Sequence, residues 1–295
     1  MQPKRREPRE ISQFKVYYDA VKTAGGDLHD RGATRQLIRD FRTFGFIDQI
    51  SFCPFLGVLC PTNVLPLGPK MLDAHGVGNT TLVNWALADY VPAWNGSKAG
   101  LGNATNTTKY CNTLIPQNRV MLDGANSGFF GVGVSGGPVP TGNEFDCGAR
   151  DTSSAYASQL SAQLFANPSY ARQAGFGLTS LDSFSAYVAT AVEPSFLGNH
   201  FAYRSTTKSL LAKNTQTPTE SSTGIGSGAW TARPFFTHNR SLNGSPGVAE
   251  YSKKTLTYAI FGLNGWFPTD AQRLTLHNIL RDWQIAHGIP ASTFA

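Results

Sequence analysis

The stretch LTYAIFGLNGWFPTDAQRLTLHNILRDWQIAHG, residues 256–288, decides the fold. It begins with apolar side chains at alternate positions, Leu256, Tyr258 and Ile260, and this period of two predicts a half-buried strand. Glycine and asparagine residues then interrupt the pattern. After them the apolar spacing changes to that of a helix, so the stretch predicts a strand, a turn and a helix.

The start of this helix is marked by local signals. Thr269 and Gln272 have the spacing of a capping box, and Asp270 places a negative charge in the first turn. Gly288 and Pro290 end the helix. Burying a large apolar side chain is worth about 1.5–3 kcal/mol, so we expect the helix to pack on another part of the protein. Its apolar stripe consists of Leu276, Ile279, Leu280, Trp283 and Ala286.

The composition limits the class of protein. The 295 residues are 41% hydrophobic, which supports a substantial core, and only 15% charged, which is below the usual quarter. We expect a surface rich in Gly, Asn, Ser and Thr, or one covered by neighbouring subunits. The net charge of +6 is spread thinly, and no Lys/Arg stripe with interleaved aromatic residues follows the first ten residues. Nucleic acid is therefore not the expected partner.

Location and redox state follow from what the sequence contains. No apolar run approaches the ~20 residues that a membrane-spanning helix needs. The first residues lack the apolar region of a secretory signal, so we expect synthesis in a reducing cytoplasm. The four cysteines, none in a C-x-x-C pair, are then expected to remain thiols: Cys53, Cys60, Cys111 and Cys147.

Residues 1–10 are predicted to form a mobile basic arm. They contain Lys4, Arg5, Arg6 and Arg9, and two prolines that disfavour helix and strand. Two interpretations remain open. The arm is either a solvated tail or a segment that becomes ordered on an acidic partner.

Residues 11–51 are predicted to form a helical hairpin. Phe14 and Tyr17 belong to the apolar stripe of a first helix that a glycine pair ends, and Phe41 and Phe44 to that of a second helix. Two short helices cannot hide this aromatic surface between themselves. We expect the hairpin to dock on the following domain or on another subunit, and to act with the basic arm as an anchor.

The rest of the chain is predicted to be mainly β. In residues 52–80, four prolines interrupt an apolar run and indicate a linker without a regular central strand. Residues 81–295 contain short apolar runs between turn clusters, a pattern typical of an antiparallel sandwich. The expected strands lie in residues 82–91, 128–136, 144–149, 184–192, 200–205, 228–236 and 256–262.

Three stretches carry a resemblance to a known group of proteins. They are YYDAVKTAGGDLHDRGATRQLIRDFRTFGFIDQI at 17–50, KAGLGNATNTTKYCNT at 98–113 and the closing stretch at 256–288. Their layout resembles that of viral and prophage structural proteins with a concanavalin A-like domain of the lectin/glucanase, LamG-like jelly-roll type. The resemblance implies that a helical hairpin precedes the sandwich and that the last helix covers one of its ends or faces.

We examined the sequence for catalytic and metal-binding residues. Glu144 and Asp146 begin the alternating carboxylate run of sandwich glucanases, but no third carboxylate follows, so we interpret them as a strand-edge pair. No Ser, His and Asp set can be assembled from the sequence alone, and the spacings typical of zinc sites are absent from the sequence. We therefore expect no cofactor and no enzymatic activity. Calcium remains open, because Asp123, Asn126 and Asp151 are candidate loop ligands.

Carbohydrate binding is the other chemistry that the sequence suggests. Sugar sites combine an aromatic platform with amide or carboxylate side chains in loops. The alternative for each candidate set is a tryptophan that closes one end of the sandwich. The candidates are Tyr90, Trp94 and Asn95 in one loop, and Trp230, His238 and Asn239 in another.

Together these observations predict a structural protein of a bacteriophage virion, in a capsid-decoration or tail/baseplate position. It would be made in the host cytoplasm, form a symmetric homo-oligomer and contact other virion proteins. The hairpin would anchor it and the lectin-like sandwich would face outward. Two alternatives are a host-glycan adhesin and a polysaccharide-degrading glycoside hydrolase.

Overall fold

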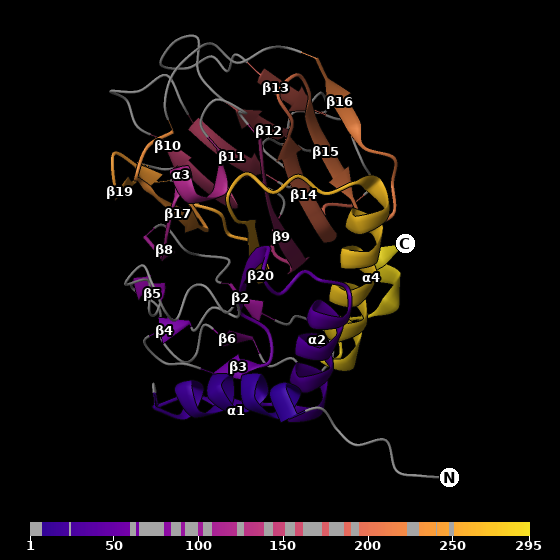
Figure 1. Cartoon of the computed structure of the whole chain (residues 1–295). Helices are drawn as coiled ribbons and strands as arrows, with labels where there is room; N and C mark the ends of the chain where they lie inside the picture. The colour runs from indigo at the N-terminus through magenta and orange to yellow at the C-terminus, as the bar shows by residue number, and fades with distance from the viewer. Residues whose placement is uncertain are drawn as a thin grey trace.

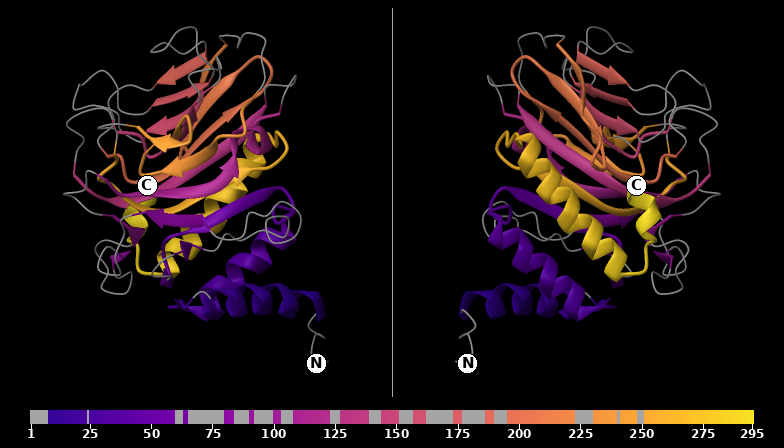
Figure 2. Two further views of the ribbon diagram at one scale, coloured as in Figure 1. Left: turned by 90° about the vertical axis from the view of Figure 1, so that its left-hand side faces the viewer. Right: turned by 90° about the vertical axis from the view of Figure 1, so that its right-hand side faces the viewer.

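In the computed structural model, the chain is mainly β, with its long helices near the N-terminus and near the C-terminus of the chain (Figure 1). Two sheets lie over one another, and helices cover the outer face of one of them, as Figure 2 shows from two sides. The structure describes residues 8–23, 25–59, 63–64, 80–83, 90–91, 100–102, 108–122, 127–138, 144–150, 157–161, 173–176, 186–189, 195–222, 230–239, 241–247 and 251–295.

The sheet next to the helices, here called the helix-side sheet, is antiparallel throughout its described pairs. Its strand order is β16-β15-β14-β9-β20-β7-β6, and β2 also pairs with β20. These strands are β16 (Thr219–Ser221), β15 (Ser209–Lys213), β14 (Gly198–Arg204), β9 (Gly128–Gly136), β20 (Thr255–Gly262), β7 (Gly100–Leu101), β6 (Tyr90–Val91) and β2 (Ile50–Pro54).

The second sheet, here called the outer sheet, has the order β13-β12-β11-β10-β17-β8-β5-β4, with β18 beside β10 and β19 beside β18. Its described pairs are antiparallel except β10 with β18. These strands are β13 (Ala186–Ala189), β12 (Gln173–Phe176), β11 (Ala157–Ser161), β10 (Cys147–Arg150), β17 (Pro234–Thr237), β8 (Tyr110–Pro116), β5 (Thr80–Val83), β4 (Asn63–Val64), β18 (Ser241–Leu242) and β19 (Ser245–Pro246). A separate two-stranded sheet joins β1 (Asp27–Leu28) and β3 (Val58–Leu59).

Helices α1 (Pro8–Thr23), α2 (Arg31–Thr43) and α4 (Asp270–Ala286) form the third layer, and α3 (Gln117–Val120) and a 3-10 turn (Ala291–Phe294) are short. The ring of His29, before α2, lies 6.4 Å from that of His287, after α4. Phe46, after α2, packs on Trp266, before α4. The two helices therefore run antiparallel, and the first and last helical segments share one core.

The prediction for residues 256–288 is confirmed in its elements and corrected in its burial. Thr269 and Gln272 form the expected capping box at the start of α4. All eight residues of β20 are buried, however, whereas the alternation predicted a half-buried strand. A period of two distinguishes the faces of a strand but cannot show that a helix layer covers one face and a second sheet the other.

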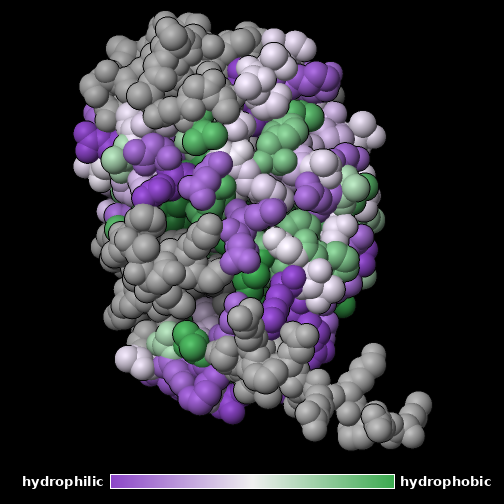
Figure 3. All heavy atoms as spheres, viewed as in Figure 1, coloured by the Kyte–Doolittle hydropathy of each residue, from purple (hydrophilic) through white to green (hydrophobic). Residues whose placement is uncertain are grey.

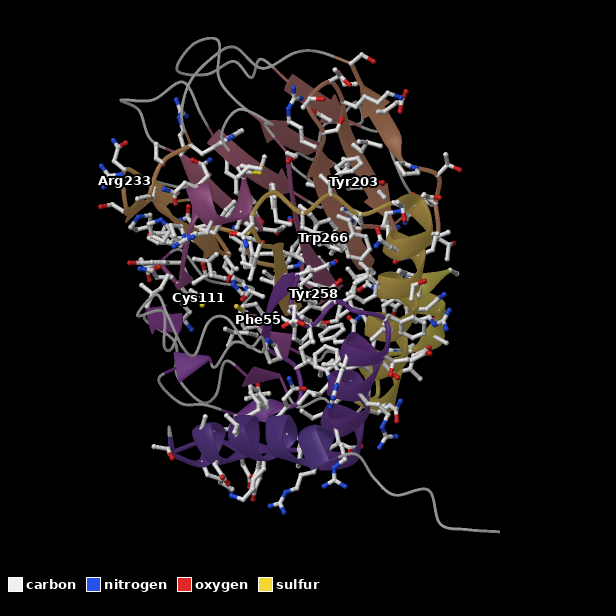
Figure 4. All side chains as sticks on the ribbon, in the orientation of Figure 1. Phe55, Cys111, Tyr203, Arg233, Tyr258 and Trp266 are labelled. Carbon is white, nitrogen blue, oxygen red and sulfur yellow. The ribbon has the colours of Figure 1, made fainter. Side chains whose placement is uncertain are left out.

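Each face of β20 belongs to a different core. Tyr258 and Ile260 contact the helices, and in Figure 4 Tyr258 and Trp266 lie on this side. Ala259 and Phe261 face the outer sheet. The alternation slips at residue 257, where the pairing with β9 is irregular, so that Thr257 and Tyr258 both face α4. This bulge turns the side chain of Thr257 toward α4.

Buried hydrogen bonds fasten α4 to this face. Tyr258 Oη and Gln284 Nε2 both donate to Asn199 Oδ1, at 3.0 and 2.7 Å. Thr257 Oγ1 donates to Gln284 Oε1 at 2.8 Å. Because the polar groups of this interface are paired with one another, the helix is held in one position rather than by apolar contact alone.

Two boundaries differ from the sequence prediction, and the structure decides between the docking alternatives. Helix α1 begins at Pro8, inside the predicted arm, because proline is tolerated in the first turn of a helix. Strand β2 lies where the prolines indicated a linker, and it accommodates Pro54 as its last residue. The hairpin packs on α4 and the helix-side sheet, which is the first of the two docking alternatives.

The described cysteines Cys53, Cys111 and Cys147 are buried, Cys53 and Cys147 are free, and Cys60 lies outside the described residues. Burial raises the pKa of Cys53 and Cys147 well above the ordinary value. Within the part of the chain that the structure describes, no helix combines the length and the apolar character needed to cross a membrane.

Candidate functional site

The predicted anchor residues have two different positions in the structure. Phe14, Tyr17 and Phe41 are buried in the protein's own core, so they hold the hairpin to the sandwich and cannot insert into a partner. Phe44 is 55% exposed and remains available. Of the basic residues, Lys4, Arg5 and Arg6 lie outside the described residues, and Arg9 lies in α1 with its side chain not described.

A row of arginines that the sequence analysis missed lies on α2. Its spacing of i, i+4, i+8 and i+11 places the four side chains on one flank of the helix, away from the buried face. The spacing is present in RGATRQLIRDFRT, residues 31–43, where the same residues also carry the apolar stripe of the helix. The arginine row consists of Arg31, Arg35, Arg39 and Arg42.

Aromatic side chains of α1 support two members of this row. The guanidinium of Arg31 lies 4.5 Å from the ring centre of Tyr18, and that of Arg35 lies 4.7 Å from the ring centre of Phe14. A cation–π contact holds each guanidinium in position over a ring. The row therefore presents oriented donors for carboxylate or phosphate groups.

The charge of the molecule is concentrated at this end. Residues 1–43 contain ten Lys and Arg and six Asp and Glu, so they carry +4 of the net charge of +6. Two of the acidic residues form ion pairs within this segment, Asp19 with Lys15 and Asp27 with Lys22. The Lys22 ammonium, 2.8 Å from Asp27, lowers the pKa of that carboxyl. Figure 3 shows hydrophilic residues gathered over the hairpin at the lower end of this face.

The second predicted sugar site lies in the interior. Trp230, His238 and Asn239 are all buried, and Trp230 packs in the core between the sheets. His238 Nε2 lies 2.8 Å from the carbonyl oxygen of Leu101, and burial lowers its pKa to about 4. Asn239 forms two hydrogen bonds with the backbone of Gly247. These side chains hold loops together in the interior and form no exposed aromatic platform.

The first predicted sugar site is only partly described. Tyr90 belongs to β6, whose backbone pairs with β7 at Leu101, while Trp94 and Asn95 lie outside the described residues. Carbohydrate binding there stays a prediction. The calcium candidates Asp123, Asn126 and Asp151 lie outside the described residues as well. Among the residues that are described, no cluster of three or more His, Cys, Asp or Glu side chains could hold a metal ion.

The two candidate carboxylates are not a strand-edge pair. Asp146 is fully buried and Glu144 nearly so. Lys254 Nζ lies 3.1 Å from Asp146 Oδ1, and both side chains are inaccessible to solvent. Ser252 Oγ donates to the same oxygen at 2.6 Å. Lys254 and Ser252 are far from Asp146 in sequence, so no local pattern could have grouped these residues, which we call the Asp146 cluster together with Glu144.

No protein-family model and no curated protein matches the chain. Solved structures that resemble it include a Trypanosoma rangeli sialidase in complex with 2,3-difluorosialic acid, with 10% identity, a TM-score of 0.48, and coverage of 86% of this chain and 40% of that one. A mutant of that sialidase displaying trans-sialidase activity is similar, with 11% identity, a TM-score of 0.43, and coverage of 85% and 39%. An arabinofuranosidase complexed with arabinofuranosyl-alpha-1,2-xylobiose has 12% identity, a TM-score of 0.33, and coverage of 78% and 51%.

These comparisons correct one prediction. The expectation that the protein is not an enzyme is wrong as an inference from the fold, because the similar structures are glycoside hydrolases. The chain spans about two fifths of the length of the sialidases that it matches. At this identity and TM-score they assign no substrate and no catalytic residue to it.

Proposed function

We propose that this chain is a structural protein of a bacteriophage virion, on the capsid or the tail, with its sandwich of the concanavalin A-like jelly-roll type. The helical end attaches it to the particle and the sandwich faces outward. Copies of the chain contact one another and other virion proteins. The resemblance of the hairpin, the middle segment and the closing stretch to viral structural proteins supports this role.

The observation that carries the proposal is the arginine row. Four arginines share one flank of α2, and two of them are oriented by aromatic rings of α1. The remainder of the chain, with 15 basic and 13 acidic residues, is close to neutral. A molecule whose charge is gathered at one end attaches to an acidic surface in one orientation.

Immunogold labelling of intact particles tests the role directly. Antibodies against the sandwich should label particles of the virus that encodes the chain, at regular positions on the capsid or the tail. If particles stay unlabelled while the free protein in the same lysate binds the antibody, the virion role is wrong.

Charge reversal tests the attachment surface. The double substitution Arg31→Glu and Arg35→Glu should lower the particle-bound fraction about tenfold, equivalent to about 1.4 kcal/mol, because each exposed charge contributes up to about 1 kcal/mol. The measurement is cosedimentation with particles at several salt concentrations. Arg119→Glu, on the exposed side of α3, is the matched control and should leave the bound fraction unchanged. Equal loss with the control would mean that overall charge, not this row, drives binding.

A further inference from the structure

The Asp146 cluster contains an unusual pair for a protein interior. Lys254 Nζ and Asp146 Oδ1 are 3.1 Å apart and neither side chain has any accessible surface. The apolar core between the sheets lies next to them, including Cys147 and the Phe55 ring that packs on His238. The contact therefore holds together an amine and a carboxyl, which are the two functional groups that amide formation joins.

From this geometry we propose that Lys254 and Asp146 condense to an intramolecular isopeptide bond, with Glu144 as the proton shuttle. The Lys254 Nζ lone pair attacks Asp146 Cγ, the carbon bonded directly to Oδ1, and an N–C bond forms. The Cγ–Oδ2 bond breaks, and Oδ2 leaves with two protons as water. No oxidant or reductant is required, because an amine and a carboxylic acid become an amide and one water molecule.

The surrounding groups supply what this step needs. The Ser252 hydroxyl donates to Asp146 Oδ1 at 2.6 Å, so it would stabilise the negative charge that develops on this oxygen. The backbone N–H of His238 donates to the carbonyl oxygen of Asp146 at 2.9 Å and fixes the residue. With Nζ and the carboxyl held in contact, the reaction is unimolecular and gains the corresponding advantage in rate.

Glu144 is placed to move the protons. It lies two residues before Asp146, the charges of Lys254 and Asp146 both act on its carboxyl, and the Lys253 N–H donates to its Oε2 at 3.1 Å. Burial raises the pKa of Glu144, while the positive charge of Lys254 opposes that effect. A carboxyl with a raised pKa can give a proton to the leaving oxygen and take one from the attacking nitrogen.

Mass spectrometry of the intact, denatured protein tests the bond. The wild-type chain should be lighter than its sequence mass by one water molecule, and tandem spectra should show a peptide pair joined through Lys254 and Asp146. An unchanged mass, with both residues recovered in separate peptides, would overturn the proposal. Because this readout uses the wild-type protein, it does not depend on whether a variant folds.

Variants distinguish the isopeptide bond from other reactions in which the chain loses one water molecule. Asp123–Gly124 can lose the same mass by succinimide formation, but that loss would survive in Lys254→Arg, whereas the isopeptide bond would not. Lys208→Arg, at an exposed lysine that pairs with Glu220, is the control and should retain the bond. Glu144→Gln should fold and show at least about a tenfold lower cross-linked fraction. This is a conservative figure, because a proton-transfer group usually contributes more than tenfold to the rate of a reaction. Full cross-linking in Glu144→Gln would overturn the role of Glu144.

Discussion

His277 lies buried between α4 and β14, with its Nδ1 3.1 Å from Asn199 Nδ2. Asn199 Oδ1 already accepts from Tyr258 and Gln284, so Nδ2 is the donor and the ring nitrogen accepts. Protonation of Nδ1 would place two donors against each other. Burial lowers the pKa of His277 to about 4, with the positive charges of Arg281 and Arg273 acting in the same direction.

This histidine predicts a loss of stability in mild acid. The unfolded chain takes up the proton near pH 6.5 and the folded chain only near pH 4, so the unfolded state binds more protons between these values. The contribution of His277 is complete above pH 6.5 and falls by up to about 3 kcal/mol as the pH drops to 4. Urea unfolding at a series of pH values measures it. His238, with a pKa lowered to about 4, adds to the same slope, while Glu144 with its raised pKa opposes it.

A pair of variants isolates the contribution of His277. His277→Asn keeps an acceptor near Nδ1 but cannot titrate, so the slope of stability against pH between 4 and 6.5 should decrease by about one proton. Ile285→Ala, at an exposed position on the same helix that carries no titratable group, should leave the slope unchanged. A slope that is the same in His277→Asn as in the wild type would contradict this assignment.

The polar residues also show where sequence reasoning reached its limit. Trp230, His238 and Asn239 have the residue types of a sugar site, and residue type alone cannot show that β10, β17 and neighbouring loops enclose them. The Asp146 cluster was hidden for a related reason. Its lysine and aspartate are 108 positions apart in the sequence. They come together because the residues just before β10 and just before β20 lie side by side in the fold.

At the scale of single elements, α4 could be predicted and β2 could not. The limits of α4 depend on neighbours within one turn, and Thr269 and Gln272 are such neighbours. Strand β2 depends on β20, a partner from the other end of the chain, which pairs with all five of its residues. Local rules about proline therefore predict a linker at residues that form a strand in the structure, because β20 pairs with them.

Trp283 is the residue of α4 whose removal should loosen the hairpin. Its ring packs edge-on against Phe52 at 5.4 Å and near Tyr258 at 6.5 Å, in the core that also contains Phe41. Trp283→Ala should lower the free energy of unfolding by about 3–5 kcal/mol. Urea unfolding measures this loss, and limited proteolysis should show faster cleavage within residues 14–45.

Ile285 provides the control for this substitution. It lies on the same helix but is exposed, so Ile285→Ala should change the free energy of unfolding by no more than about 0.5 kcal/mol. Unchanged cleavage of the hairpin in Trp283→Ala would show that α2 is held by other contacts.

At the scale of the whole molecule, the hairpin is part of the folded unit rather than a separate anchor domain. Its buried aromatic residues, α4 and the helix-side sheet form one apolar cluster. A chain that begins at residue 46 should therefore expose this face, bind a hydrophobic dye strongly and self-associate on gel filtration. A chain that lacks only residues 1–7 should behave like the full-length protein. A monomeric, dye-free product from the larger deletion would mean that the sandwich is stable without the hairpin.

The proposed isopeptide bond would act at this scale as well. Asp146 precedes β10 of the outer sheet and Lys254 precedes β20 of the helix-side sheet, so the bond would join the two sheets covalently. For a closed loop of about 100 residues, a cross-link stabilises the folded state by about 4–5 kcal/mol through the entropy of the unfolded chain. Such a link suits a protein that must persist on the outside of a particle.

The shared core of the first and last helices also has a consequence during synthesis. Phe41 and Phe52 leave the ribosome more than 200 residues before Trp283, the tryptophan that covers them. Until Trp283 emerges, the nascent chain carries an exposed apolar face, which is a target for chaperones and a risk for aggregation. Expression of this protein should therefore depend on how quickly translation proceeds from Phe52 to Trp283.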